Sequence, residues 1–598
     1  MESKVLKKRG EIQEKDKWAV NEIYSCDEEW EREYKELQEE APKLKNFEGK
    51  LGDAKVLEEY FEVNEKTSRK AEKIYVYAHL RSDEDTSNTT YQAMMNKIDA
   101  YMAEYATYTA YVVPEILALP DGTIEKLMNE NKGLEPYKFL IENILKEKPH
   151  VLDKKEEELL AAASDCLDAP SSIHNIMTNA DMKFGNIKDE DGEEVELTEG
   201  NYSSFIKSKD RNVRKAAFER LFGEYKSFEN TLATTLSSSI KVFNFGAKIR
   251  NYNSALEASL KPNDIPTEVY TNAVKTINDN LSSLHRYVKL KKKLLGLEEM
   301  HMYDLYVPVI EVPKERVEFD KAVEMAVEGL NPLGKEYLDI FQGGINGGWI
   351  DKYINKGKRG GAYSWGGYDT KPYVLLNYNY ELNDVSTLVH EMGHSIHSYY
   401  SRKEQSYYYA GYTLFCAEVA STTNEALLIH HLINKETDKK KKLYLINQEL
   451  EQIRTTVFRQ VMFAEFELYT HESFEKGLPL TAQDYNAKWH ELNVKYFGPD
   501  MVVDSDIDVE WSRIPHFYSD FYVYQYATGY AAASAFANSI LNGEKDAVEK
   551  YVGFLKSGGS DYPIEILKKA GVDMTTSKPL EATINRFNEL LDMLEKEI

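Results

Sequence analysis

The segment 383–398 constrains the fold of this chain most tightly, because its apolar residues recur at the spacing of a buried helix. Asn383 or Asp384 can cap the start of that helix. Its apolar stripe comprises Val385, Leu388, Val389, Met392 and Ile396. The same segment contains His390-Glu391-Met392-Gly393-His394, whose two histidines are four residues apart and therefore share a different face of the helix. The sequence thus predicts a rigid helix that presents two imidazoles side by side.

These two histidines are spaced to bind one divalent metal ion. Histidines at positions i and i+4, with a glutamate directly after the first, form the HExxH pattern of zinc peptidases, in which the glutamate takes a proton from a water at the metal. His397 adds a third imidazole to the helix, and stacked histidines on a buried helix are unfavourable without partners. A purely structural histidine cluster is the alternative, but the helical context favours metal binding by His390 and His394.

A catalytic zinc ion takes three protein ligands and keeps one position for water, so one more ligand is needed. His397 is seven residues from His390, roughly 10 Å along a helix axis, which suits packing better than a shared metal. Glu418 and Glu425 lie in a second predicted helix, and their spacing of seven places both on one face. One of these carboxylates can bind the metal while the other orients a ligand through a hydrogen bond.

The acidic composition of the chain argues against several classes of partner. Its 598 residues include 100 acidic and 74 basic side chains, for a formal net charge of −26. A surface of this charge repels phosphate backbones and anionic lipids, so we expect no nucleic acid and no membrane as a partner. No apolar run approaches the roughly 18 residues of a transmembrane helix, and the N-terminus lacks the apolar core of a signal peptide. With only Cys26, Cys166 and Cys416 as cysteines, these features predict a cytoplasmic protein.

Helical periodicity dominates the N-terminal part of the chain. Over residues 1–165, apolar side chains recur at spacings of three and four among charged ones, which predicts a bundle or stack of antiparallel helices. Residues 182–198 predict a hairpin with a turn at Asp191-Gly192. Residues 357–380 predict a glycine-rich loop and two strands before the metal-binding helix. A strand beside a metal site can pair with an extended peptide, and the alternative is a small sheet that only supports the helix.

Together these motifs resemble the M3 metallopeptidases and, among them, the oligoendopeptidase F group. The resemblance covers nearly the whole chain and is carried by residues 390–398 and by Ala417-Glu418-Val419-Ala420-Ser421. It implies one zinc ion per chain, bound by His390, His394 and Glu418, with Glu391 as the catalytic base.

The resemblance also implies a fold class and an organisation of the chain. The fold is expected to be mainly α, with a deep substrate channel and small β elements near the zinc helix. Residues 1–200 are expected to form a helical N-terminal region, and residues 201–598 the catalytic region.

A histidine and several tyrosines near the C-terminus are candidates for stabilising the oxyanion of a tetrahedral intermediate. His516 is followed by a tyrosine-rich segment in which Tyr522 and Tyr526 share a helical face. Related M3 enzymes use a histidine and tyrosines in this way, so the resemblance implies that role for His516 and for Tyr522 or Tyr526. The alternative is packing, because the chain has 42 tyrosines and a cluster of them is unsurprising.

The sequence therefore predicts a zinc-dependent endopeptidase that hydrolyses internal bonds of short oligopeptides. One alternative is a zinc-containing peptide-binding protein without hydrolytic activity, although a structural site would need no base at Glu391. Another is an exopeptidase, which would need a pocket for a peptide terminus. The sequence leaves the oligomeric state open.

Overall fold

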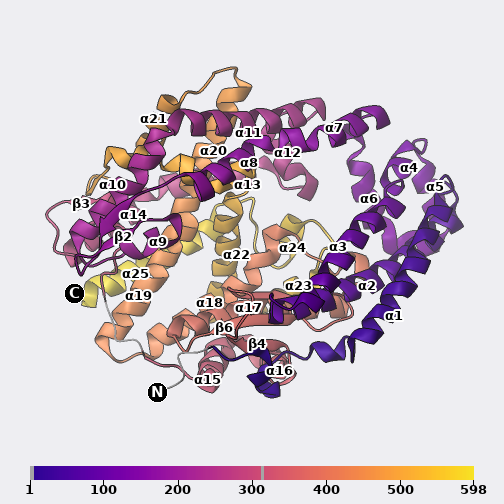
Figure 1. Ribbon diagram of the computed structural model, residues 1–598, viewed down its shortest axis with the longest axis horizontal. Coiled ribbons are helices and arrows are strands. Elements are labelled where there is room, and N and C mark those ends of the chain that lie inside the picture. The colour runs from indigo at the N-terminus through magenta and orange to yellow at the C-terminus, as the bar shows by residue number, and fades with distance from the viewer. Residues whose placement is uncertain (1–5, 311–314, 598) are drawn as a thin grey trace. The chain divides into compact units, whose positions relative to one another are not determined.

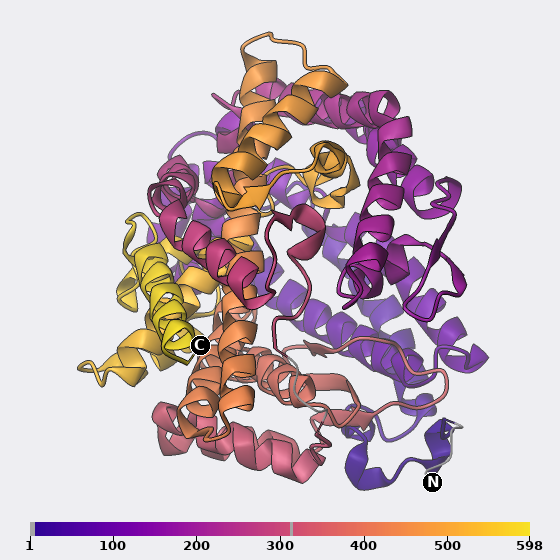
Figure 2. The same ribbon diagram turned by 90° about the vertical axis from the view of Figure 1, so that its left-hand side faces the viewer.

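The computed structural model describes residues 6–310 and 315–597, and Figures 1 and 2 show that helices dominate it. The chain is 72% helical and only 4% strand, which confirms the mainly α fold with small β elements. Within the described residues, no helix is both long and apolar enough to cross a membrane.

The chain forms two compact units, each assembled from separate stretches of sequence. Unit 1 contains the described residues of Met1–Pro149, Lys314–His431 and Phe536–Gly571. Unit 2 contains the described residues of His150–Pro313, Leu432–Ala535 and Val572–Ile598. The sequence predicts a helical N-terminal region over residues 1–200 and a catalytic region over residues 201–598. These are regions of the family's sequence and not compact units of the structure, so this boundary stays a prediction.

The first α-helices of unit 1 form a bundle in the N-terminal third of the chain, and the other α-helices of this unit lie in its later stretches of sequence (Figure 1). Together they are α1 (Asp27–Glu40), α2 (Ala54–Glu84), α3 (Thr89–Thr109), α4 (Val112–Ala118), α5 (Thr123–Glu130), α6 (Lys138–Lys146), α15 (Phe319–Leu330), α16 (Gly334–Asn346), α17 (Leu382–Glu404), the first part of α18 (Leu414–Lys435), α23 (Ala547–Ser557) and α24 (Pro563–Lys569). The apolar spacing of α1 buries Trp30, Tyr34 and Leu37, and the Trp30 indole donates a hydrogen bond to the Ile74 carbonyl of α2 at 2.8 Å.

A three-stranded sheet in unit 1 leads directly into α17 and confirms the two strands predicted over 357–380. Strand β6 (Tyr373–Tyr378) is central, parallel to β4 (Ile350–Tyr353) and antiparallel to β5 (Tyr363–Trp365). β5 therefore forms one edge of the sheet. The side chain of Lys358, in the glycine-rich loop, is buried and donates hydrogen bonds to three backbone carbonyls, including that of Leu376 in β6. This lysine fixes the loop against the sheet.

Unit 2 is also helical, and it contains the predicted hairpin. Its α-helices are α7 (Lys154–Leu167), α8 (Ala169–Ile176), α9 (Glu199–Phe205), α10 (Arg211–Ser227), α11 (Glu229–Ile249), α12 (Ala255–Leu260), α13 (Thr267–Asp279), α14 (Leu281–Leu294), α19 (Lys439–Ile453), α20 (Arg459–Glu475), α21 (Ala482–Phe497), the first part of α22 (Tyr524–Leu541) and α25 (Lys578–Glu597). The hairpin pairs β1 (Asn186–Lys188) with β2 (Glu194–Glu196), and β3 (Met300–His301) pairs with β7 (Met501–Val502).

Unit 2 contains a near-continuous helical column, orange in Figure 2. In it, α19 passes through one π-helical segment, Arg454–Phe458, into α20. Trp489 of α21 is fully buried against Phe463 and Phe466 of α20, with ring centroids 5.4 and 4.9 Å apart. This aromatic core supports the segment that carries His516.

Candidate metal centre

The HExxH pentapeptide lies in the middle of α17, as the sequence predicts. Glu381 is the N-cap of this helix, so neither Asn383 nor Asp384 occupies the cap position expected from the sequence. Asp384 stabilises the helix start from the first turn, where its carboxylate accepts hydrogen bonds from the backbone N–H groups of Asn379 and Glu381. The predicted apolar stripe is fully buried (0% exposed): Val385, Leu388, Val389, Met392 and Ile396. Burial of that stripe fixes the direction in which the histidines point.

His390, His394 and Glu418 bring together three atoms that can bind a metal ion. The Nε2 atoms of the two histidines are 3.3 Å apart, and each lies 3.4 Å from Oε2 of Glu418. A tetrahedral zinc ion with bonds of about 2.0–2.1 Å has edges of roughly 3.3–3.4 Å, so the three atoms match three of its corners. Within residues 6–310 and 315–597, this is the one group of three such side chains whose donor atoms all lie within 4.8 Å of one another.

Glu425 contacts His390 on the side away from the other two donors. Its Oε2 lies 3.3 Å from Nδ1 of His390, and its Oε1 accepts a hydrogen bond from the Ser386 hydroxyl at 3.0 Å. A carboxylate at one ring nitrogen fixes the tautomer in which the other nitrogen can bind a metal. Spacing alone leaves Glu418 and Glu425 as equivalent candidates, and the family resemblance implies Glu418. The structure places Glu418 beside the histidine Nε2 atoms and Glu425 at Nδ1 of His390.

A close approach between α17 and α18 allows this geometry. A Cβ atom on Gly393 would lie 2.7 Å from Cα of Ser421 and 2.9 Å from the carbonyl oxygen of Ala420. Glycine at the fourth position of the pentapeptide is therefore required by packing. Asn424 joins the same two helices, because its side-chain amide donates to the Val389 carbonyl at 3.0 Å.

The charges at the site favour an ionised carboxylate beside the histidines. Burial alone would raise the pKa of Glu418, but the hydrogen bond to His394 and the charges of both histidines outweigh it and lower the pKa to about 2. Burial opposes protonation of His390, yet the hydrogen bond and charge of Glu425 raise its pKa to about 9. Without metal, this anionic pair of glutamates therefore attracts a proton to His390. The same charges would attract a divalent cation, which would displace that proton.

Glu391 is buried next to the two histidines. Its side chain is 7% exposed and makes no hydrogen bond within the described residues. Burial raises the pKa of Glu391, and the charges of His390 and His394 oppose that shift. A carboxylate with a raised pKa and no competing donor is suited to accept a proton.

His397 lies apart from the three donor atoms, in agreement with the packing interpretation. Its ring is buried and stacked on Tyr412, with centroids 3.8 Å apart, and it also contacts Phe554. Burial lowers the pKa of His397 to about 3, so the ring is neutral at ordinary pH.

The remaining predicted residues, His516, Tyr522 and Tyr526, form a cluster within unit 2. The Tyr526 hydroxyl lies 3.2 Å from Nε2 of His516, and the Tyr522 ring contacts both, at centroid distances of 5.8 Å to His516 and 5.4 Å to Tyr526. Burial lowers the pKa of His516, which favours its neutral form. The structure thus brings the three side chains together. Their role in catalysis at the metal centre of unit 1 stays a prediction.

Two residues that shape this cluster have no signal in the sequence. Phe521, directly before Tyr522, has φ +60°, a left-handed conformation that is unusual for a bulky residue. Its backbone N–H donates to Oε1 of Glu467 in α20 at 2.7 Å. Burial raises the pKa of Glu467 well above its usual value, which disfavours the charged form of this carboxyl. A contact between residues 54 positions apart depends on the tertiary fold and leaves no local pattern.

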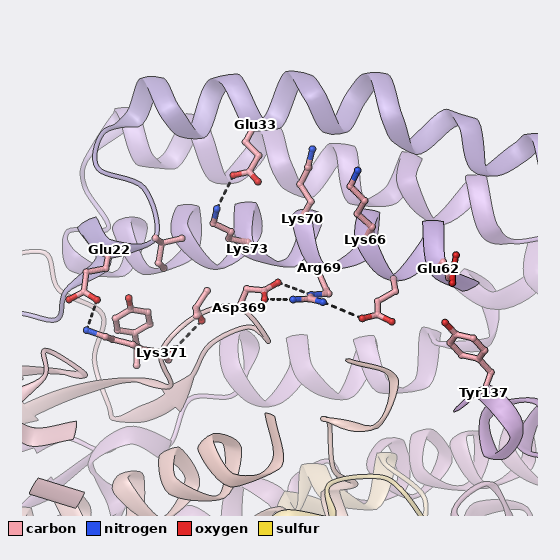
Figure 3. Close-up of a pocket in the computed structure, with 14 residues that line it drawn as sticks. Glu22, Glu33, Glu62, Lys66, Arg69, Lys70, Lys73, Tyr137, Asp369 and Lys371 are labelled. Atoms are coloured by element: carbon pink, nitrogen blue, oxygen red, sulfur yellow. Dashed lines mark hydrogen bonds and ion pairs between the residues drawn. The ribbon is translucent and has the colours of Figure 1, made fainter. Parts of the chain in front are cut away.

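A large cavity of unit 1, about 900 Å³ in volume, contains none of the candidate residues. Figure 3 shows it beside α2, where most of its charged side chains form ion pairs. These pairs include Arg69 with Asp369, Lys73 with Glu33, and Lys371 with Glu22. Because these charges neutralise one another, the cavity offers no cluster that could bind a metal.

Comparison with known proteins identifies the family of this chain. The model of peptidase family M3 matches residues 204–586, and that of oligopeptidase F matches residues 115–184. The chain is 48% identical to oligopeptidase PepF of Bacillus subtilis over 99% of this chain and 88% of the relative. It is 42% identical to group B oligopeptidase PepB of Streptococcus agalactiae over 98% of each.

A solved structure supports the same assignment. The crystal structure of oligoendopeptidase-F from Enterococcus faecium superimposes with a TM-score of 0.73 at 41% identity, covering 96% of this chain and 99% of that chain. The chain therefore belongs to peptidase family M3, within its oligoendopeptidase F group, and is a metalloendopeptidase.

Proposed function

We propose that this metalloendopeptidase uses one zinc ion to hydrolyse internal bonds of short oligopeptides in the cytoplasm. The observation that carries the proposal is the triangle of His390, His394 and Glu418 donor atoms, with edges of 3.3 to 3.4 Å. The names of the relatives, oligopeptidase and oligoendopeptidase, support short peptides as the substrate class. The acidic composition and the few cysteines support the cytoplasmic location.

The donor set fits zinc. Two neutral imidazoles and one carboxylate are ligands that zinc accepts in catalytic sites, whereas magnesium and calcium prefer sites made of oxygen alone. When bound, zinc supplies Lewis acidity, which polarises a peptide carbonyl and brings the pKa of water toward neutrality. The contact between Glu425 and His390 keeps Nε2 directed toward the metal position.

Glu391 is the proposed general base and general acid. It takes a proton from the attacking water and later gives that proton to the leaving amine. Its burial supports both steps, because the raised pKa makes the carboxylate a better proton acceptor than an exposed glutamate. Its lack of another hydrogen-bond partner within the described residues leaves its oxygens available to water.

His516 and a neighbouring tyrosine are the proposed oxyanion donors. The Tyr526 hydroxyl and the Nε2 atom of His516 are within hydrogen-bonding distance of each other, so they are close enough to donate an O–H and an N–H to one oxyanion that replaces their mutual hydrogen bond. The lowered pKa of His516 means that it acts as a neutral donor near pH 7. Tyr522 stacks beside both and is the second candidate.

The edge strand β5 is the proposed docking site for the peptide backbone. An extended peptide can add to a free sheet edge through main-chain hydrogen bonds, which bind many sequences equally. The Ser364 hydroxyl of β5 lies 2.8 Å from that of Ser395 in α17, next to His394. This link holds the edge strand against the metal-binding helix.

A peptide library tests the proposal. Metal-free, zinc-restored and Glu391→Gln proteins are incubated with peptides of mixed length, and the products are identified by mass spectrometry. We expect internal cuts with the zinc-restored wild type alone. No cleavage after zinc is restored, or removal of terminal residues only, would contradict the proposal.

A further inference from the structure

A cavity of about 260 Å³ beside the metal-binding helix has no part in the mechanism above. It lies within unit 1, between the residues before β5, the end of β6 and the first turns of α17. Its lining residues include Gly361, Asn377, Asp384 and Thr387. Its volume is below the roughly 300 Å³ of the smallest drug-sized pockets, so it is suited to a single amino-acid side chain.

The cavity is close to the metal centre along α17. Thr387 and Asp384 precede His390 by three and six residues, which is about 4.5 and 9 Å along the helix axis. An extended peptide advances roughly 3.3 Å per residue. A peptide that pairs with β5 and has its scissile bond at the metal therefore places a side chain at the cavity about one to three residues from that bond.

The polar groups that line the cavity are acceptors of hydrogen bonds. Oδ2 of Asp384 accepts from two backbone N–H groups, but Oδ1 accepts no hydrogen bond, and Asp384 has no ion-pair partner within the described residues. Asn377 donates both of its amide hydrogens, to the carbonyls of Arg359 and Gly361, and its buried Oδ1 has no donor. The Thr387 hydroxyl donates to the Asn383 carbonyl, which leaves its oxygen to accept.

The nearby cations are already paired with other acids. Lys358 lies 2.7 Å from Asp351, and the Arg359 guanidinium lies 2.8 Å from Asp83. Arg316, from the segment before α15, stacks on Tyr380 and pairs with Glu318 at 2.7 Å. The charge of Asp384 is therefore not neutralised by a direct partner, and the site lacks a group with several N–H donors and a positive charge.

We propose that this cavity is a subsite for a lysine or arginine side chain of the substrate, within about three residues of the scissile bond. The proposal rests on the function proposed above. The Asp384 carboxylate provides the charge, and Asn377 and Thr387 provide further acceptors for the N–H groups of that side chain. The subsite would give the enzyme a preference that main-chain pairing to β5 cannot provide.

The test uses the zinc-loaded enzyme and a series of N-acetylated peptides that are identical except for one position. Lysine, glutamine or glutamate occupies that position, which is moved along the peptide, and mass spectrometry locates the cut. We expect lysine to raise kcat/KM about 3- to 10-fold over glutamine at one position, as a partly exposed charged hydrogen bond would. The preference should fall in about 1 M salt, where the Debye length is about 3 Å.

Two variants assign this preference to the cavity. Asp384→Asn keeps an oxygen that can accept the backbone hydrogen bonds but removes the charge, so the ratio of lysine to glutamine should approach one. Thr387→Lys places a tethered ammonium at the cavity and should abolish the preference while Asp384 remains. Asp339→Asn on α16, which removes an acid from an exposed ion pair with Lys335, is the matched control and should keep the wild-type ratio.

Three results would overturn the proposal. They are equal cleavage of lysine and glutamine peptides, a preference that survives Asp384→Asn in folded protein, and a preference seen only when the N-terminus is left unacetylated. The last result would assign the cavity to a terminal ammonium. Absence of all cleavage would instead refute the proposed function, and binding of the same peptides to zinc-loaded Glu391→Gln, measured by fluorescence anisotropy, would then still decide the preference.

Discussion

The metal centre of unit 1 and the His516 cluster of unit 2 are built from different kinds of structure. In the metal centre, one helix carries two donors, and a second helix carries the third donor, Glu418, and the orienting residue Glu425. In the His516 cluster, the histidine lies in a short 3-10 turn, Pro515–Tyr518, and Tyr526 lies at the start of α22. Tyr522 follows a residue in a left-handed conformation.

This difference shows where sequence spacing determines geometry. A helix converts a spacing of four residues into a fixed distance between side chains, so the pentapeptide alone sets the positions of His390 and His394. In a loop, sequence spacing does not determine the distance between side chains, and the conformation depends on remote partners such as Glu467. The predictions below test whether the two regions differ in this way.

Removal of a metal ligand should have the largest effect. Glu418→Ala deletes one of three donors and should abolish both stable zinc binding and activity at limiting zinc. Glu425→Ala should lower zinc affinity only about 10- to 100-fold, because it removes an orienting partner of His390. Metal content after dialysis measures both variants. The reverse order would exchange the roles of the two glutamates.

Removal of the base should come next. Glu391→Gln preserves shape but cannot accept a proton, so we expect kcat to fall about 10²- to 10⁴-fold with zinc content unchanged. Steady-state kinetics and metal analysis on the same sample separate the two properties. Wild-type kcat in this variant would refute the assigned base.

Changes in the His516 cluster should have a smaller effect. Tyr526→Phe removes one proposed oxyanion donor and should lower kcat about 10²-fold with little change in KM. Tyr522→Phe is the matched comparison, because its ring contacts the same histidine. A larger loss of kcat for Tyr522→Phe would assign the oxyanion donor to Tyr522. Full activity of both variants would show that the tyrosines of the cluster only pack against one another.

Substitution of Glu467, which holds the loop that carries Tyr522, should have the smallest effect on activity. Glu467→Leu leaves the buried N–H of Phe521 without an acceptor, which should cost about 1–3 kcal/mol of stability and lower kcat about 10-fold. Glu467→Gln should retain most activity, because its carbonyl oxygen accepts the same bond and burial already disfavours the charged form of the native carboxyl. Chemical denaturation and kinetics measure the two effects. Equal behaviour of both variants would contradict the positioning role.

Much of the metal centre could be predicted from the sequence, because most of its residues lie close together along the chain. The spacing of His390 and His394 and the apolar stripe from Val385 to Ile396 belong to one helix, so periodicity specifies them. The choice between Glu418 and Glu425 could not be made from spacing, since both lie on one face of α18. It depends on the close packing of α18 against Gly393.

The mainly α fold and the small strands were also predictable, because each depends on local periodicity. The two compact units were not, since each combines stretches that are far apart in the chain. The conformation of Phe521 and its hydrogen bond to Glu467 were likewise inaccessible to spacing rules. The predicted substrate channel stays a prediction.

Anomalous diffraction at the zinc absorption edge, from crystals of zinc-loaded protein, tests the central claim most directly. We predict one strong peak within about 2.0–2.2 Å of His390 Nε2, His394 Nε2 and a Glu418 carboxylate oxygen, with no fourth protein ligand. A peak elsewhere, no peak at this position, or a fourth side chain bound to the ion would contradict the account.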